Sequence, residues 1–460
     1  MKFKTRVIFF VFFSIVICAS AQTHVWNGNG GDLNWSNATN WNVGTVPITS
    51  SNVLIPDGFD VEIRNSPATS NAIEIEGTGH LTVANSLSLG SEIFISLLSE
   101  LTFEEGLLSG GIIESSGTIT LVGIGATRTF NNVIINNAGL IFITESNQTI
   151  ILDSTINNLS QGVIDIPSNG GIVHQNTSST LNNAGIVIKS QGSTQLGNYY
   201  MLMTINNTGT IEVVEDQTVL LLASQYEFNN LEEGKMIGGG VYDITAIFTN
   251  MGTVYPGKID GVGIMDVTNN FSLNDGSIEL DLEGTQTDEY DIVRVAGGPD
   301  LTGTLNLKLS FAPEIDDEFV VVTSLFNMAN CNFPSETTAD YNGLEYTFDI
   351  VCNTNDVTLR VTEVTILRTE DFALNDSNFF VQPNPVRDDA RFIFSSETFG
   401  FGSQETSIKL YNLMGQEVQT LPNYSESNNT FSRGNLNSGL YFAQLISEGN
   451  IIATTKLVLR

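Results

Sequence analysis

The stretch Asn182-Asn183-Ala184-Gly185-Ile186-Val187-Ile188 is one copy of the motif that decides the fold of this chain. In each copy an Asn-Asn pair is followed shortly by a glycine and then by a short apolar strand. Further copies begin at Asn136, Asn157 and Asn206, and degenerate copies at Asn229 and Asn250. The first five Asn pairs in chain order are separated by 21, 25, 24 and 23 residues.

A fixed period in the range of about 20 to 50 residues is the signature of a solenoid. Each period here holds two or three short strands rich in Ile, Val, Leu, Thr and Phe, without helical spacing of apolar residues. Asn and Gly tolerate the left-handed backbone that a sharp corner needs. We therefore predict an all-β fold: a right-handed, three-sided parallel β-helix over residues 61–260. Its coils would stack about 4.8 Å apart, with asparagine side chains bonded from coil to coil.

A solenoid of this kind needs caps, because its end coils have unpaired edges. All three tryptophans, Trp26, Trp35 and Trp41, fall within residues 22–60. Their spacing resembles the start of secreted, autotransporter-like β-helical passengers, which implies an N-terminal cap. A platform for stacking on sugars is the alternative reading of the same cluster.

Residues 261–367 have a different pattern, in which strands alternate cleanly between apolar and polar positions, as in Ser277-Ile278-Glu279-Leu280-Asp281-Leu282. Such alternation is typical of antiparallel sheets. The region resembles the closing part of the same passengers, so we predict a β-rich C-terminal cap. Cys331 and Cys352 lie here, and in an oxidising compartment we expect them to form a disulfide.

The amino terminus indicates export. Lys2, Lys4 and Arg6 precede an apolar run, and Ala19-Ser20-Ala21 has the small residues of a cleavage site. We predict a signal peptide over residues 1–21 that is cut between Ala21 and Gln22, and a mature chain with no transmembrane segment. A retained anchor is the weaker alternative, because the apolar run is shorter than the roughly 18 residues that such a helix needs.

The chain is strongly acidic, with 18 Lys and Arg against 51 Asp and Glu, and removing the three cations of the signal takes the net charge from −33 to −36. This charge argues against nucleic acid and anionic membranes as partners, and it keeps an exposed repeat protein soluble. Ca²⁺ binding is the alternative use of the carboxylates. Two acidic clusters, Asp288-Glu289-Asp291 and Asp316-Asp317-Glu318, are candidates for it.

The sequence contains no nucleophile elbow, zinc motif or phosphate loop. Aligning the repeats places Asp165, Val187 and Glu212 at one outward position of three successive coils, with Lys189 nearby as a basic partner on the outer surface. The two carboxylates would then be two coils, or about 9.6 Å, apart. That separation is near the upper limit for an inverting glycosidase, so a lyase or hydrolase of polysaccharides stays an alternative.

The last segment, residues 378–460, carries several spaced motifs: Pro383-Asn384-Pro385, a strand ending at Gly415, Gly439 followed by Tyr441, and a terminal strand with Lys456. This series resembles the type A C-terminal sorting domain of the type IX (Por) secretion system. The resemblance implies a small β-sandwich that the outer-membrane translocon recognises. It also implies a secreted or surface location, with cleavage of the domain and then attachment to lipopolysaccharide or release.

Taken together, these patterns predict a secreted or cell-surface β-helix protein that is adhesin-like, structural or binding. Its partners would be the type IX translocon and a surface polysaccharide or lipopolysaccharide. The alternative is a polysaccharide-processing enzyme or a carbohydrate binder that uses the flank of the β-helix.

Overall fold

The computed structural model describes residues 24–122, 127–144, 148–167, 171–174, 179–191, 200–214, 219–222, 226–269, 271–366, 379–394, 406–422, 430–447 and 450–460. The expected signal peptide and its cleavage site at Ala21 and Gln22 lie outside these residues. The chain divides into two compact units, residues 1–365 and 366–460. Among the described residues, no helix is long and apolar enough to cross a membrane.

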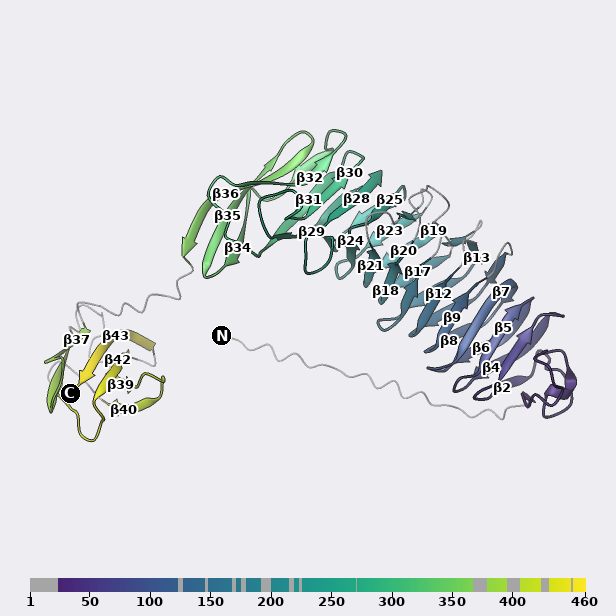
Figure 1. The fold of residues 1–460 in the computed structure, drawn as a ribbon, viewed down its shortest axis with the longest axis horizontal. Coiled ribbons are helices and arrows are strands. Elements are labelled where there is room, and N and C mark those ends of the chain that lie inside the picture. The colour runs from purple at the N-terminus through teal and green to yellow at the C-terminus, as the bar shows by residue number, and fades with distance from the viewer. Residues whose placement is uncertain are drawn as a thin grey trace. The chain divides into compact units, whose positions relative to one another are not determined.

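The first unit is a parallel β-solenoid with three strands in each coil of its central part (Figure 1). A strand pairs there with the strand three elements before it and the strand three elements after it. Thus β11 (Ile134–Asn137) pairs in parallel with β14 (Thr155–Asn158), and β14 pairs with β17 (Thr180–Asn183). The solenoid that the repeat period predicts is confirmed.

The strands follow three sides of the solenoid, which we number in the order the chain visits them. Side 1 contains β10 (Arg128–Asn131), β13 (Gln148–Leu152), β16 (Gly171–His174), β19 (Tyr200–Leu202), β22 (Val219–Leu222), β25 (Val241–Ile244), β28 (Ile264–Asn269), β30 (Ile292–Val295) and β32 (Glu318–Ser324). Side 2 contains β2 (Asn52–Ile55), β4 (Ala68–Ile75), β6 (Leu87–Ile95), β8 (Ile112–Ser115), β11, β14, β17, β20 (Thr204–Asn207), β23 (Glu227–Asn230) and β26 (Ile247–Asn250).

Side 3 contains β3 (Asp60–Ile63), β5 (His80–Ala84), β7 (Glu100–Ser109), β9 (Thr118–Leu121), β12 (Leu140–Ile143), β15 (Val163–Asp165), β18 (Ile186–Lys189), β21 (Thr210–Val213), β24 (Lys235–Gly238), β27 (Thr253–Pro256), β29 (Ser272–Leu282), β31 (Asp300–Leu309) and β33 (Asn330–Asn332). The longer strands near the start turn a corner. Strand β7, for example, pairs with β5 at its beginning and with β10 at its end.

The second asparagine of each pair lies inside the corner between sides 2 and 3 and forms a buried ladder, which we call the inner ladder. Its members are in register on consecutive coils: Asn137, Asn158, Asn183, Asn207, Asn230 and Asn250. From Asn137 to Asn230, each side chain donates an N–H to the amide oxygen of the next member at 2.7–2.8 Å, and Asn250 accepts the last of these bonds. These bonds satisfy amides that burial would otherwise leave unpaired at a cost of roughly 1–3 kcal/mol each.

The glycine that follows each pair is required because consecutive coils approach closely at this corner. A Cβ atom on Gly185 would lie 2.2 Å from the carbonyl oxygen of Gly162 in the preceding coil. The same conflict recurs at Gly209, 2.2 Å from the oxygen of Gly185. An asparagine pair followed by a glycine after one or three intervening residues therefore marks one corner per coil.

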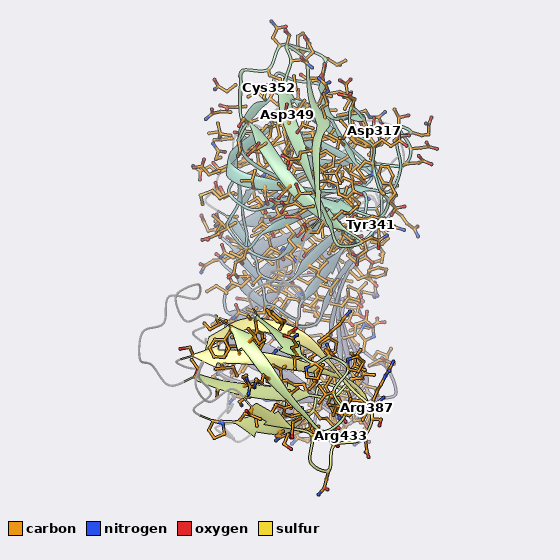
Figure 2. All side chains as sticks on the ribbon, turned by 90° about the vertical axis from the view of Figure 1, so that its left-hand side faces the viewer. Asp317, Tyr341, Asp349, Cys352, Arg387 and Arg433 are labelled. Carbon is orange, nitrogen blue, oxygen red and sulfur yellow. A yellow bond between two sulfur atoms is a disulfide. The ribbon has the colours of Figure 1, made fainter. Side chains whose placement is uncertain are left out.

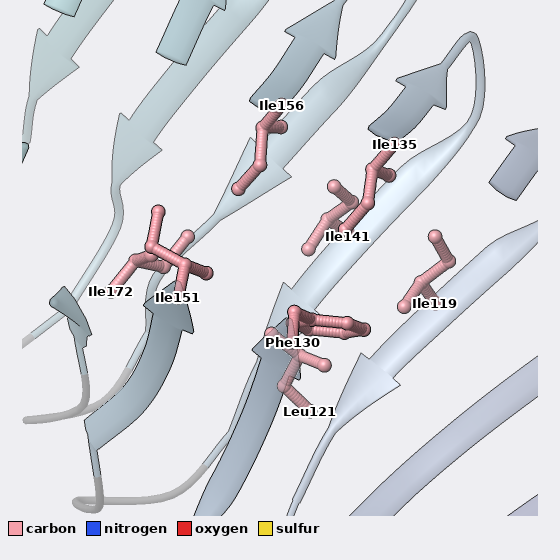
Figure 3. Close-up of a pocket in the computed structure, with 8 residues that line it drawn as sticks. All are labelled: Ile119, Leu121, Phe130, Ile135, Ile141, Ile151, Ile156 and Ile172. Carbon is pink, nitrogen blue, oxygen red and sulfur yellow. The ribbon is translucent and has the colours of Figure 1, made fainter. Parts of the chain in front are cut away.

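The core is a single apolar cluster that runs through the coils, since inward side chains such as Ile156, Leu181 and Ile205 stack on their counterparts. A small void interrupts it, lined by eight Ile, Leu and Phe side chains, among them Ile119 and Phe130 (Figure 3). Because no polar group lines this void, we interpret it as a packing gap.

The expectation of antiparallel strands after residue 261 is wrong for most of that region. Strands β28, β30 and β32 continue side 1 in parallel, and β29, β31 and β33 continue side 3. Antiparallel pairing occurs between β32 and β36 (Asp356–Ile366) and between β34 (Glu336–Tyr341) and β35 (Leu344–Cys352). The alternation does not distinguish the two kinds of strand, because a parallel solenoid strand also has one face in the core and one in solvent.

The start of the solenoid is covered by residues 26–51, which follow β1 (His24–Val25) and include a short 3-10 helix, η1 (Ala38–Asn40). Trp26, Trp35 and Trp41 are each only 2% exposed, and the indole N–H of Trp41 donates to the carbonyl of Trp35 at 2.9 Å. The other two rings meet Trp41 edge-on at 5.0 and 4.9 Å. These buried rings offer no face on which a sugar could stack.

At the other end, a disulfide joins Cys331 in β33 to Cys352 at the end of β35. It therefore ties the β34–β35 hairpin to the last parallel strand of side 3. The expected disulfide is present.

The second unit has two sheets around its own core. One sheet has the order β37 (Phe379–Gln382), β38 (Asp389–Phe394), β41 (Thr430–Ser432), and the other has the order β40 (Glu417–Leu421), β39 (Thr406–Tyr411), β42 (Gly439–Ser447), β43 (Asn450–Leu459). All their pairings are antiparallel. Phe392 and Phe431 of the first sheet share a core with Leu410 and Leu445 of the second, as expected for a small sandwich.

Candidate functional site

In the second unit, the Pro383-Asn384-Pro385 turn lies against the terminal strand β43. The Asn384 side chain accepts a hydrogen bond from the backbone N–H of Val458 and donates one to the carbonyl of Lys456, both at 2.9 Å. Next to it, the N–H of Val386 donates to the carbonyl of Val458 at 2.7 Å. The first motif of the segment and its last strand therefore form one structure, although about 70 residues separate them in sequence.

The other motif residues have local roles. Gly415 ends the β39–β40 turn with φ +75°, a left-handed conformation that suits glycine. Tyr441 is buried in the core, and its hydroxyl donates to the carbonyl of Asn437 at 3.0 Å, so it holds the loop that leads to Gly439. Lys456 is exposed. Gly415 and Tyr441 therefore serve the fold of this unit.

Arg433, which sequence reasoning missed, joins the loops at the same end of the unit. Its guanidinium donates to the carbonyl of Leu436 at 2.9 Å, to the Ser438 hydroxyl at 3.0 Å and to the carbonyl of the last residue, Arg460. It also lies 3.5 Å from the carbonyl of Arg387 (Figure 2). A planar group with five donors suits this task. The available signal was a single arginine in the loop of residues 433–438, whose other members are Gly, Asn, Leu and Ser.

Comparison with known protein families decides what this unit is, because the family model described as the secretion system C-terminal sorting domain matches residues 381–460. The chain carries a type IX sorting domain. No curated protein matches the sequence. The sorting domain indicates export by the type IX system to the outside of the cell and an interaction with that machinery. The passenger ahead of the sorting domain is the solenoid.

The sorting domain differs from its passenger in charge. Residues 366–460 contain 7 Lys and Arg against 10 Asp and Glu, whereas residues 1–365 contain 11 against 41. The acidity of the chain is therefore a property of the solenoid. The basic residues of the sorting domain include Arg387, Arg433 and Lys456.

On the solenoid flank, the proposed catalytic column is partly wrong. Strand register aligns Asp165 with Ile188 and then with Glu212, so the middle position is Ile188 and not Val187. Val187 faces the core and is 1% exposed. Asp165 and Glu212 do lie two coils apart in one outward column. The Asp165 carboxylate accepts a hydrogen bond from the Ser190 hydroxyl at 2.5 Å.

Lys189 is not on the outer surface, contrary to expectation. It continues the inward column that holds Val213 in the next coil, and it is 1% exposed. Its ammonium donates to the carbonyl of Ile166 at 3.0 Å and to that of Gln191. Burial lowers its pKa to about 8, against the opposing effect of the Asp165 charge. A lysine held inside the coil in this way does not fit a catalytic base for a ligand on the flank.

The two acidic clusters do not converge as calcium sites. Asp291 is buried, and its oxygens accept the backbone N–H groups of Gly263 at 2.6 Å and Asp281 at 2.8 Å. Burial raises its pKa to about 8. Asp316 pairs with Arg360. Within the described ranges, no group of three or more His, Cys, Asp or Glu side chains is placed to hold a metal ion.

A shallow groove lies beside β28 and β30, lined by Asp266, Tyr290, Arg294 and neighbouring loop residues. Arg294 and Asp266 are in register on adjacent strands and form two hydrogen bonds of 2.7 Å. Arg294 and Asp266 therefore form a cross-strand ion pair at the surface of this groove.

Proposed function

We propose that this protein is a cell-surface binding element, adhesin-like rather than enzymatic, in which the sorting domain delivers the solenoid to the outer face of the cell. The observation that carries the proposal is the match of residues 381–460 to the sorting family, in a unit that is compact by itself. The passenger is a capped rod with a continuous core, and such rods present long repetitive flanks for contact with a partner.

The proposal includes attachment. After recognition by the outer-membrane translocon, the sorting domain would be removed and the passenger attached to lipopolysaccharide, as the resemblance to type IX cargo implies. The expected domain boundaries are part of this proposal: residues 1–21 as signal peptide, 22–60 and 261–367 as caps, 61–260 as repeats and 378–460 as the exported tag.

Deletion of residues 378–460 in the native host tests delivery. The full chain should be degraded when protease is added to intact cells, whereas the truncated chain should be protected in the periplasm. A control deletion within the solenoid of one coil, residues 159–183, should be exported as the full chain is. Protease-accessible truncated protein would contradict the role of the tag.

A second candidate function, cleavage of acidic polysaccharides, draws support from the register of Asp165 with Glu212. Their column positions are two coils, or about 9.6 Å, apart, near the upper limit for an inverting pair. Turnover of uronate-containing polysaccharides by the full chain, abolished in Asp165→Asn and retained in the exposed control Asp153→Asn, would establish it. An absence of turnover, or turnover unchanged in Asp165→Asn, would remove it.

A further inference from the structure

The first asparagine of each pair forms a second ladder on the outer face of side 2, which we call the outer ladder. Its members are Asn136, Asn157, Asn182, Asn206 and Asn229, in register on five consecutive coils. Each side-chain N–H from Asn157 onward donates to the amide oxygen of the preceding member, at 2.8, 2.9, 3.0 and 3.1 Å. The ladder therefore holds its amides in one repeated orientation.

A column of hydroxyl groups runs beside the outer ladder. Thr155, Thr180 and Thr204 are aligned on the same strands, two residues before the asparagines, and so they point to the same side of the sheet. Together the two columns form a polar face. Between Thr155 and Asn206 it carries no charged residue at an outward position, and acidic side chains appear only beyond, at Glu114 and Glu227.

Folding alone does not account for the outer ladder. The inner ladder satisfies a buried corner, but the outer asparagines are half-buried or exposed, and asparagine is among the residues depleted in strands. An amide has two N–H donors and an oxygen with two acceptor positions, and stacking uses one of each. At Asn157, Asn182 and Asn206, on coils about 4.8 Å apart, the ladder thus keeps one donor and one acceptor for a partner. At Asn229 the side-chain N–H groups donate to Asn206 and to Glu227.

These features define the partner. Regular spacing favours a ligand that itself repeats. An uncharged patch on a solenoid with 8 basic against 41 acidic residues over positions 24–365 favours a neutral ligand. Paired donors and acceptors favour hydroxyl groups, which both donate and accept. An interface between two copies of the chain would instead need aromatic or aliphatic side chains at its centre, and the face from Thr155 to Asn206 presents hydroxyls and amides.

We propose that the polar face of side 2 binds a neutral polysaccharide that lies along the stack of coils, with its hydroxyl groups on the outer ladder. This inference rests on the proposed binding function and names its ligand class. Individual contacts with such a chain are weak, because they replace bonds to water. Several coils that engage successive sugars of one polymer add their effects.

The test measures binding of the full mature chain to four neutral polysaccharides: cellulose, xylan, mannan and β-1,3-glucan. Pectate is included as an acidic polysaccharide for comparison. The variant Asn157→Val, Asn182→Val, Asn206→Val removes the hydrogen-bonding groups but keeps high strand propensity. Thr118→Val, Thr210→Val, Thr253→Val is the matched control on side 3, where all three threonines are half-buried. Circular dichroism checks that both variants keep the β signal of the parent.

The parent should bind at least one neutral polysaccharide and not pectate, and the outer-ladder variant should bind it at least about tenfold more weakly, while the control is unchanged. Equal binding by parent and outer-ladder variant would overturn this inference and leave the proposed binding function standing. Binding of the parent to pectate and to none of the neutral polysaccharides would also overturn this inference and leave the proposed binding function standing. If the parent binds no glycan and no cell surface, both proposals fail. A parent dimer in light scattering that the outer-ladder variant abolishes would reassign the face to a second copy.

Discussion

The side chain of Asn384 accepts a hydrogen bond from the backbone N–H of Val458 at 2.9 Å, and this bond ties the first motif of the sorting domain to its terminal strand. A second bond, from the same amide to the carbonyl of Lys456, completes the pairing. The turn thus takes the place of a strand along this part of β43. The Pro383-Asn384-Pro385 motif is therefore part of the structure that holds β43 in place.

Replacing Asn384 by alanine should loosen the terminal strand. Both side-chain bonds are lost, and at about 1 kcal/mol per hydrogen bond the local stability should fall by roughly 2 kcal/mol. Hydrogen exchange of the full chain should show faster exchange at residues 456–460, while the solenoid is unchanged. The exposed loop variant Asn435→Ala is the control, and equal effects of the two changes would contradict the assignment.

The two asparagines of one repeat should differ sharply in their effect on stability. Asn183 is buried and bonded to Asn158, Asn207 and the carbonyl of Thr210. Asn183→Ala leaves these groups unsatisfied, so we expect a loss of about 3 kcal/mol. Asn182→Ala, one position away on the outer ladder, should cost less than about 1 kcal/mol. Urea unfolding followed by circular dichroism compares them, and equal losses would show that the corner bonds do not hold the coil.

Much of this architecture can be predicted from the sequence because one corner repeats. The Asn pairs define which residues of neighbouring coils are in register, and that register is confirmed from Asn137 to Asn250. The error at Val187 arose from the alignment of the following strand. Counting from the corner glycine, Asp165, Ile188 and Glu212 are each the third residue after Gly162, Gly185 and Gly209.

Other features resist prediction for physical reasons. Alternation along β18 already places Lys189 on the inward face, but a charged residue is expected in solvent, and only the structure reveals the carbonyl groups that surround it. Alternation also cannot distinguish a solenoid strand from an antiparallel one, so the extent of the parallel region was underestimated. The role of Arg433 depends on loops that meet only in the folded domain.

The buried Lys189 should give the solenoid a characteristic alkaline pH dependence. Its folded pKa is about 8 and its ordinary value is 10.5, so between these values the unfolded chain binds more protons than the folded one. Stability should therefore rise from pH 8 to 10.5, by at most about 1.4 kcal/mol per pH unit. Lys189→Met should remove this rise and the exposed control Lys258→Met should not. Urea midpoints at three pH values measure it, and a rise retained in Lys189→Met would contradict the assignment.

Asp291 should have the opposite effect in the acidic range. Burial raises its folded pKa to about 8 from 3.8, so the folded state keeps a proton that the unfolded state has released. Stability attributable to this group is complete below pH 3.8 and is lost as the pH rises towards 8. Asp291→Asn should reduce the change of the urea midpoint with pH over this window, whereas the exposed control Asp288→Asn should leave that change as it is in the parent. An identical pH profile for the two variants would refute the shift.

Each repeat adds one coil in register, and this spacing can be measured as a distance between two residues of one outward column. Phe94 and Thr249 lie in one outward column and are joined by seven coil-to-coil steps, through Glu114 and the outer ladder. Spin labels on Phe94→Cys and Thr249→Cys in the full chain should give a narrow distribution near about 34 Å, and labels on Asn136→Cys and Thr249→Cys one about 10 Å shorter. A broad distribution, or equal distances for the two pairs, would contradict the solenoid.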